Sequence, residues 1–110
     1  MMLALALAAA GMGADNLFAS SITIPQLQQA CADSAKDPLL PNLCTGYILG
    51  TLDAMASYGE VCPTSTKGLT VRALEIGRQT LADYTGQSDR PPARLIGDAL
   101  KKAYPCGTPA

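Results

Sequence analysis

The sequence predicts a small all-α protein, a bundle of four helices held together by disulfide bonds. In four segments, apolar residues recur at intervals of three and four, which is the spacing of one buried helix face. Prolines and glycines separate these segments, and no stretch keeps for long the alternation of apolar and polar residues that indicates a strand. The 110 residues also include four cysteines, an even set that is typical of a disulfide framework in a short exported chain.

The N-terminus has the composition of a secretion signal. Residues 1–14 carry no charge, and an apolar run at residues 3–10 is followed by small residues. This run is too short to cross the roughly 30 Å apolar core of a bilayer as a helix. We therefore expect residues 1–14 to be a signal peptide cleaved after Gly13 or Ala14, with cleavage in the stretch through Ala19 as the alternative. The mature domain is then residues 15–110, and no membrane span is expected. The basic residues that normally precede the apolar run are missing, and the alternative is a buried N-terminal helix.

The first helix of the mature chain is expected over residues 23–36. Thr23 is a suitable N-cap, and Pro25 falls in the first turn, where a missing N–H is tolerated. Pro38 and Pro41 disfavour the helical conformation in the residue before each of them, so the helix should end near residue 36.

The second helix should begin after Asn42, a plausible N-cap, and end at Gly59. Gly46 and Gly50 lie four residues apart on another side of this helix, where they would let a neighbouring helix approach closely. The apolar stripe of the second helix consists of Cys44, Tyr47, Ile48, Thr51, Leu52 and Met55.

Two more helices follow after polar loops. The third should start at Thr70, and Gly77 in its middle lowers its stability by about 1 kcal/mol relative to alanine. The fourth should open at Pro91-Pro92 and end before Pro105. The apolar positions of the third helix are Val71, Leu74, Ile76 and Leu81, and those of the fourth are Leu95, Ile96, Ala99, Leu100 and Ala103.

The side chains point to no enzyme, metal or cofactor site. The chain has no histidine, which excludes histidine-based acid–base catalysis and zinc sites with histidine ligands. Eight Lys and Arg against nine Asp and Glu leave no basic excess for binding nucleic acid. Asp53 and Glu60 are both carboxylates, as are the two catalytic residues of a glycosidase. Two carboxylates seven residues apart are more commonly ordinary solvated surface groups. The cysteines lack the C-x-x-C spacing of zinc and thioredoxin-type sites, and three disulfide pairings remain open.

Some side chains could instead serve as contacts for a partner protein. Tyr47, Tyr58, Tyr84 and Tyr104 could anchor a partner, although core packing is favoured for Tyr47 and Tyr104. The basic residues of the last helix and the loop before it form either a binding strip or ordinary surface charge. These residues are Arg90, Arg94, Lys101 and Lys102.

One segment carries a resemblance to a known family. Residues 44–54 read C-T-G-Y-I-L-G-T-L-D-A and are similar to the C-x-G-Y-I-x-G-x-x-D-A core of the Rap/Tai family of type VI secretion immunity proteins. The resemblance extends over residues 17–106. The sequence departs from the family pattern at the proline-bearing link 37–41 and at Gly77. A larger residue is expected at position 77, so glycine there should thin the core. The other matching landmarks, in chain order, are Cys31, Cys62-Pro63, Pro92-Ala93-x-Leu95-Ile96 and Ala103-Tyr104-Pro105-Cys106.

The resemblance implies a periplasmic immunity protein that binds a peptidoglycan amidase effector and blocks its active site. It implies a small helical domain with two disulfide bonds, no catalysis and no cofactor. We expect the pairs Cys31–Cys44 and Cys62–Cys106, because both members of each pair lie near helix ends where the chain can reverse.

The surface that contacts the amidase is expected in the polar loops at residues 64–67 and 87–90. The sequence does not decide whether the protein forms a homodimer. It also leaves two alternative functions open. One is a general periplasmic helper such as a small stress chaperone, and the other is a lipid carrier, which would need a more continuous apolar lining. The loop residues expected to touch the partner are Thr64, Lys67, Gln87, Asp89 and Arg90.

Overall fold

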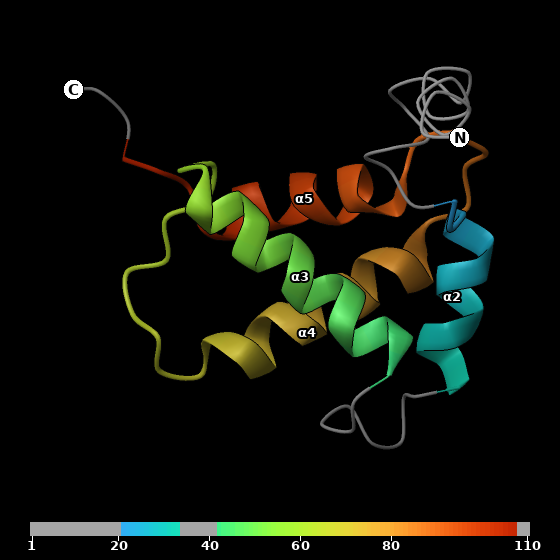
Figure 1. The fold of residues 1–110 in the computed structure, drawn as a ribbon, viewed down its shortest axis with the longest axis horizontal. Coiled ribbons are helices and arrows are strands. Elements are labelled where there is room, and N and C mark those ends of the chain that lie inside the picture. The colour runs from blue at the N-terminus through green and yellow to red at the C-terminus, as the bar shows by residue number, and fades with distance from the viewer. Residues whose placement is uncertain (1–20, 34–41, 108–110) are drawn as a thin grey trace, which may run out of the picture.

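The structure, a computed structural model, describes residues 21–33 and 42–107 and contains four helices and no strand within them. The predicted all-α class and the four-helix bundle are thereby confirmed. The signal peptide predicted at residues 1–14 lies outside the described residues, as does the end of the first predicted helix. The helices are α2 (Ile24–Asp33), α3 (Leu43–Ser57), α4 (Leu69–Asp83) and α5 (Pro92–Ala103), as Figure 1 shows.

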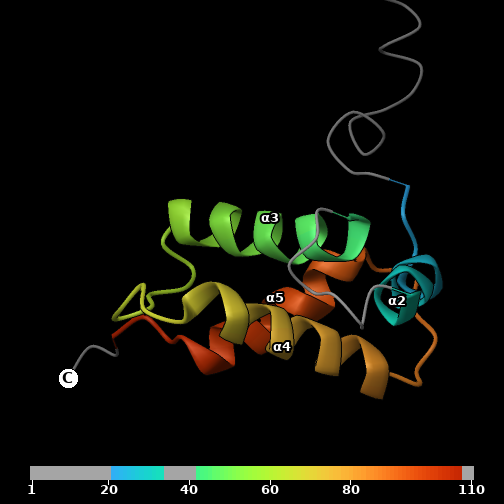
Figure 2. The same ribbon diagram turned by 90° about the horizontal axis from the view of Figure 1, so that it is seen from below.

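Helix α3 lies across α4 and α5, and α2 packs at one end of this arrangement (Figure 2). Helix α4 contacts each of the other three helices. Their apolar faces meet in one core, to which every helix contributes at least one residue that is almost inaccessible to solvent. The largest of these buried side chains are Leu27, Ile48, Leu81, Ile96, Leu100, Pro92 and Cys44.

Polar side chains cap the first two helices where the sequence predicts. The Gln26 N–H donates to Thr23 Oγ1 at 3.2 Å, and the Thr23 N–H donates to Gln26 Oε1 at 3.0 Å. This reciprocal pair satisfies two N–H groups that the start of a helix leaves open. At the start of α3, the Thr45 N–H donates to Asn42 Oδ1 at 2.8 Å.

Two glycines with positive φ fix the ends of the segment between α3 and α4. Gly59 has a φ of 71° and follows the last turn of α3, where the Glu60 N–H donates to the Met55 carbonyl at 2.8 Å. This is the bonding pattern of a glycine-terminated helix, as predicted. Gly68 has a φ of 69° and precedes α4, which therefore begins at Leu69, one residue before the predicted Thr70.

Helices α3 and α4 approach closely at Gly77. A Cβ placed on Gly77 would lie 2.7–2.8 Å from three side-chain carbons of Ile48. The expectation that Gly77 thins the core is wrong, because the Ile48 side chain fills the space that a larger residue would occupy.

The buried face of α4 differs from the predicted one. It consists of Ala73, Leu74, Gly77 and Leu81, while Val71 is 55% exposed. Val71 precedes Gly77 by six residues, which places it about 120° around the helix from that glycine and away from α3. On α5, the predicted stripe residue Ala103 is likewise exposed, because it is the last residue of the helix.

The disulfide bonds are Cys31–Cys44 and Cys62–Cys106, with Cα–Cα distances of 4.9 and 4.7 Å, as predicted. The first is buried and joins the last turn of α2 to the first turn of α3. Beside it, Arg78 Nη1 of α4 donates to the Cys31 carbonyl at 3.3 Å. The second bond fastens the segment after α3 to the tail after α5, and its Cys62 is exposed.

Candidate functional site

The two loops expected to contact a partner lie at opposite ends of the molecule. Residues 64–67 precede α4 and residues 87–90 follow it, and both views show the two loops far apart (Figures 1 and 2). Helix α4 has 15 residues, which corresponds to a length of about 22 Å. The structure therefore does not bring the two loops together. Their predicted contact residues, Thr64, Lys67, Gln87, Asp89 and Arg90, are all exposed.

Each loop contains a local turn, and one loop is also tied to a helix. The Lys67 N–H donates to Ser65 Oγ at 3.1 Å, and the Arg90 N–H donates to Ser88 Oγ at 3.0 Å. Arg90 also forms an ion pair with Asp98 of α5, with 3.3 Å between Nη2 and Oδ2. Both side chains are more than half exposed, so this pair orients the loop more than it stabilises the fold.

The loop after α4 borders a pocket of about 340 Å³ against the start of α2. Gln28 of α2 fixes the adjoining backbone, because its Nε2 donates to the carbonyls of Leu81 at 2.8 Å and Tyr84 at 3.0 Å. The pocket thus brings the predicted contact residues Gln87 and Asp89 next to α2. Its lining consists of Ile24, Pro25, Gln28, Tyr84, Gly86, Gln87, Ser88 and Asp89.

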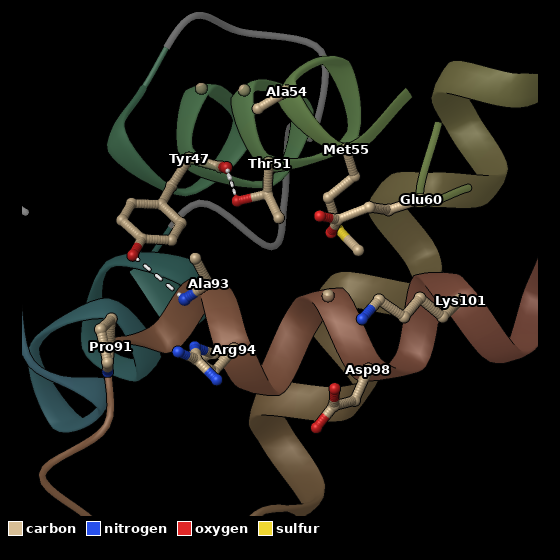
Figure 3. A pocket seen from close by; sticks show the side chains of 13 residues that line it. Tyr47, Thr51, Ala54, Met55, Glu60, Pro91, Ala93, Arg94, Asp98 and Lys101 are labelled. Atoms are coloured by element: carbon tan, nitrogen blue, oxygen red, sulfur yellow. Dashed lines mark hydrogen bonds between the residues drawn. The ribbon is translucent and has the colours of Figure 1, made fainter. Parts of the chain in front are cut away.

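A larger groove of about 520 Å³ lies between α3 and α5 (Figure 3). It extends from Pro91, next to the 87–90 loop, to Glu60, in the segment that leads to the 64–67 loop. The α3 side consists of Gly46, Tyr47, Gly50, Thr51, Ala54 and Met55, with Glu60 beyond the end of the helix. The α5 side consists of Pro91, which precedes the helix, and Ala93, Arg94, Gly97, Asp98 and Lys101.

The α3 wall of this groove is made of small residues with free space in front of them. A Cβ placed on Gly46 or Gly50 would meet no atom within 4 Å. Among the described helices, none packs against these glycines, so the neighbouring helix that they are expected to admit is not α2, α4 or α5. They form an open surface, and Ala54 continues it one turn further along α3.

Tyr47 connects the two walls of the groove. Its side chain reaches from α3 to the start of α5, where the Ala93 N–H donates to Tyr47 Oη at 3.1 Å (Figure 3). This N–H is one of those that the first turn of a helix leaves unpaired. Tyr47 is half-buried against the core, as the packing interpretation predicts, whereas Tyr58 at the end of α3 is 82% exposed.

The α5 wall carries three of the four charged residues that line the groove. Arg94, Asp98 and Lys101 follow one another on successive turns, and Glu60 faces Lys101 from the other side (Figure 3). Asp98 pairs with Arg90, while no ion pair joins Arg94 or Lys101 to another of the described residues. The suspected basic strip is therefore divided, because Lys101 lines the groove and its neighbour Lys102 does not.

The suspected acidic pair does not form a site. Helix α3 ends at Ser57, so Glu60 lies beyond the helix that carries Asp53 and does not continue its face. Glu60 lines the groove and Asp53 does not. Within the described parts of the chain, no group of three potential metal-binding side chains gathers, and no helix is long and apolar enough to cross a bilayer.

Comparison with known proteins identifies one family. A family model described as Rap1a immunity proteins matches residues 23–106. No curated protein and no solved structure matches the chain. The matched range begins at the residue that caps α2 and ends at the last cysteine, so it includes the four described helices and both disulfide bonds.

Proposed function

The chain belongs to the Rap1a immunity protein family, and we propose that it protects its cell by binding and inhibiting a peptidoglycan amidase delivered by type VI secretion. Family membership indicates an immunity protein directed at a secreted effector, and it confirms the resemblance of residues 44–54. That the effector is a peptidoglycan amidase is a further inference, and it rests on the motif at residues 44–54.

The family match over the complete disulfide-bonded bundle is the observation that carries this proposal. The match covers the four described helices and all four cysteines, which are paired in two disulfide bonds. Disulfide bonds persist in oxidising compartments such as the bacterial periplasm, which is also where peptidoglycan amidases act. We therefore place the protein in the periplasm, with residues 1–14 as its export signal.

The loop at residues 87–90 is the proposed contact with the amidase active site. It is exposed, the Arg90–Asp98 ion pair links it to α5, and it adjoins the open groove. A specific interface buries about 800 Å² on each partner. One loop is too small for that area, so the partner should also cover part of α5. The 64–67 loop lies at the far end of α4, so the amidase could reach it only through a second, separate contact.

Co-purification with a cognate peptidoglycan amidase tests the proposal. We expect a stable complex and loss of peptidoglycan hydrolysis when the two proteins are mixed. The variant Asp89→Ala/Arg90→Ala should weaken the complex without changing helical content or thermal unfolding. The matched control is Arg72→Ala/Glu75→Ala, which removes one basic and one acidic side chain from exposed positions of α4 outside both loops. Full protection of cells by the Asp89→Ala/Arg90→Ala variant would exclude the 87–90 loop as the contact.

The same experiment separates the proposal from a general periplasmic helper. A helper would bind many unfolded chains and would not bind the native amidase. Binding that requires the native amidase therefore favours the immunity function.

A further inference from the structure

Helix α3 has an uncommon composition for a helix at the surface. Among its 15 residues, Asp53 is the only charged one, whereas the shorter α5 has four. A helix that lacks a polar face is normally buried on all sides. Yet α3 exposes Leu43 by 48%, the Tyr58 that follows it by 82%, and both Gly46 and Gly50 between them. The outer face of α3 therefore has the composition of a contact surface.

This exposed face and the groove share residues and form one surface. Gly46, Gly50 and Ala54 recur every four residues, so they lie in one row along α3. All three line the groove and are exposed. In front of the two glycines, the free space lets another backbone approach α3 closely.

The length of the groove limits what can occupy it. On α5 its wall runs from Ala93 to Lys101, which corresponds to about 12 Å of helix. Two turns of a helix fit this length. A helix with small residues on one side would pack closely against the row of Gly46, Gly50 and Ala54.

The charges on the α5 wall define the chemistry of that occupant. Arg94 and Lys101 are seven residues apart on one face of the helix, a separation of about 10 Å along its axis. Between them, Asp98 is already engaged by Arg90 at 3.3 Å. Two carboxylates seven residues apart on a parallel or antiparallel helix would match Arg94 and Lys101. Glu60, at the Lys101 end, disfavours further acidic groups there.

We propose that the groove between α3 and α5 binds two turns of an effector helix, which has small residues toward α3 and acidic residues toward Arg94 and Lys101. The identity of the partner rests on the proposed function, whereas the groove and its charges do not. The occupant would cover both the open row of α3 and part of the α5 wall next to the 87–90 loop.

Binding of the amidase to groove variants tests the proposal. Gly50→Leu fills the groove, and its side chain meets no atom of the folded chain at the Cβ position. We expect its affinity to fall at least 100-fold while thermal stability is kept. The control Ala56→Leu places the same side chain on an exposed position of α3 outside the groove and should bind within threefold of the wild type.

A charge-reversed pair of variants tests the electrostatic part. Lys101→Glu should weaken binding about tenfold, mostly through slower association, and should reduce the dependence of the association rate on salt. Lys102→Glu changes the net charge equally, lies one residue away and does not line the groove, so it should have a much smaller effect. Equal effects of the two variants would overturn the assigned chemistry.

A peptide titration separates failure of this inference from failure of the proposed function. If the wild-type protein binds the amidase and Gly50→Leu binds it equally well, the groove proposal is wrong and the immunity function stands. If the wild type does not bind the amidase, the proposed function fails. The groove is then tested by NMR with an alanine-rich, side-chain-crosslinked helical peptide of about 14 residues that carries two glutamates seven apart.

In that titration, shifts of the Gly46, Gly50 and Gly97 amides with the glutamate peptide, and none with its lysine counterpart, would support the proposal. Absence of shifts with both peptides would overturn it. Sedimentation of the free protein tests whether a second copy of the chain occupies the groove instead. If the wild type is a dimer and Gly50→Leu is a monomer, the groove is a dimer interface and the proposal is overturned.

Discussion

Two glycine-to-alanine substitutions in neighbouring helices should have different effects on stability, because only one of the two positions has room for a Cβ. Gly50 and Gly77 both lie inside helices, so alanine at either position gains about 1 kcal/mol of helix propensity. At Gly50 the added Cβ meets no atom within 4 Å, and the full gain should be observed. At Gly77 it would lie 2.7–2.8 Å from three carbons of Ile48, well inside the roughly 3.5–4.0 Å of a favourable carbon contact.

Overpacking a core in this way costs about 1–3 kcal/mol, which cancels or exceeds the propensity gain at Gly77. Gly50→Ala should therefore be more stable than Gly77→Ala by about 1–3 kcal/mol. For a domain of this size, each 1 kcal/mol shifts the midpoint of thermal unfolding by about 4–8 °C. Urea and thermal unfolding, both with the disulfide bonds intact, measure the difference.

A double-mutant cycle with Ile48→Ala shows whether the contact with Ile48 is the cause. Ile48 is fully buried, so Ile48→Ala alone should cost about 2–5 kcal/mol. It also removes all three carbons that crowd position 77, and Gly77→Ala should then stabilise the protein. If Gly77→Ala stabilises the wild type as much as Gly50→Ala does, α3 and α4 are not packed as closely as described, and the reasoning is refuted.

Three further substitutions test the contacts that position the walls of the groove. Tyr47→Phe removes the acceptor for the Ala93 N–H and should lower the free energy of unfolding by about 1 kcal/mol in urea titrations, whereas an unchanged value would show that water replaces the hydroxyl. Asn42→Ala removes the side-chain cap of α3 and should cost about 1 kcal/mol by the same measurement. Replacing Cys62 and Cys106 by serine opens a loop with a sequence separation of 44 and should cost up to about 4 kcal/mol, seen as a lower unfolding midpoint than that of the oxidised wild type.

The helices could be predicted from the sequence because their ends are encoded locally. Thr23, Asn42, Gly59 and Pro92 act on the backbone within a few residues of their own positions, and each begins or ends a helix where predicted. The start of α4 shifted by one residue because Gly68, in a left-handed conformation, precedes Leu69. The disulfide pairing followed from the same helix ends together with the family resemblance.

The groove could not be predicted, because it depends on which faces of α3 and α5 meet. A pair of glycines four residues apart has the same appearance in sequence whether it packs against a helix or faces solvent. The sequence predicts packing against another helix at Gly46 and Gly50, whereas the structure leaves open space in front of both. A usable signal was present in the near absence of charge from α3, which indicates that its outer face is a contact surface.

The residues of the family motif on α3 combine two tasks because consecutive side chains leave a helix about 100° apart. Ile48 is directed into the core against Gly77, and Tyr47 reaches the start of α5 and fixes the opposite wall. Gly46 and Gly50, on the remaining side, make no such contact. Changes at Tyr47 or Ile48 should therefore reduce stability and binding together, whereas a bulky residue at Gly46 or Gly50 should reduce binding alone. If the glycines had only a structural role, a bulky residue at Gly46 or Gly50 would lower stability as well. Loss of binding with unchanged stability at these positions would therefore show that they belong to the contact surface.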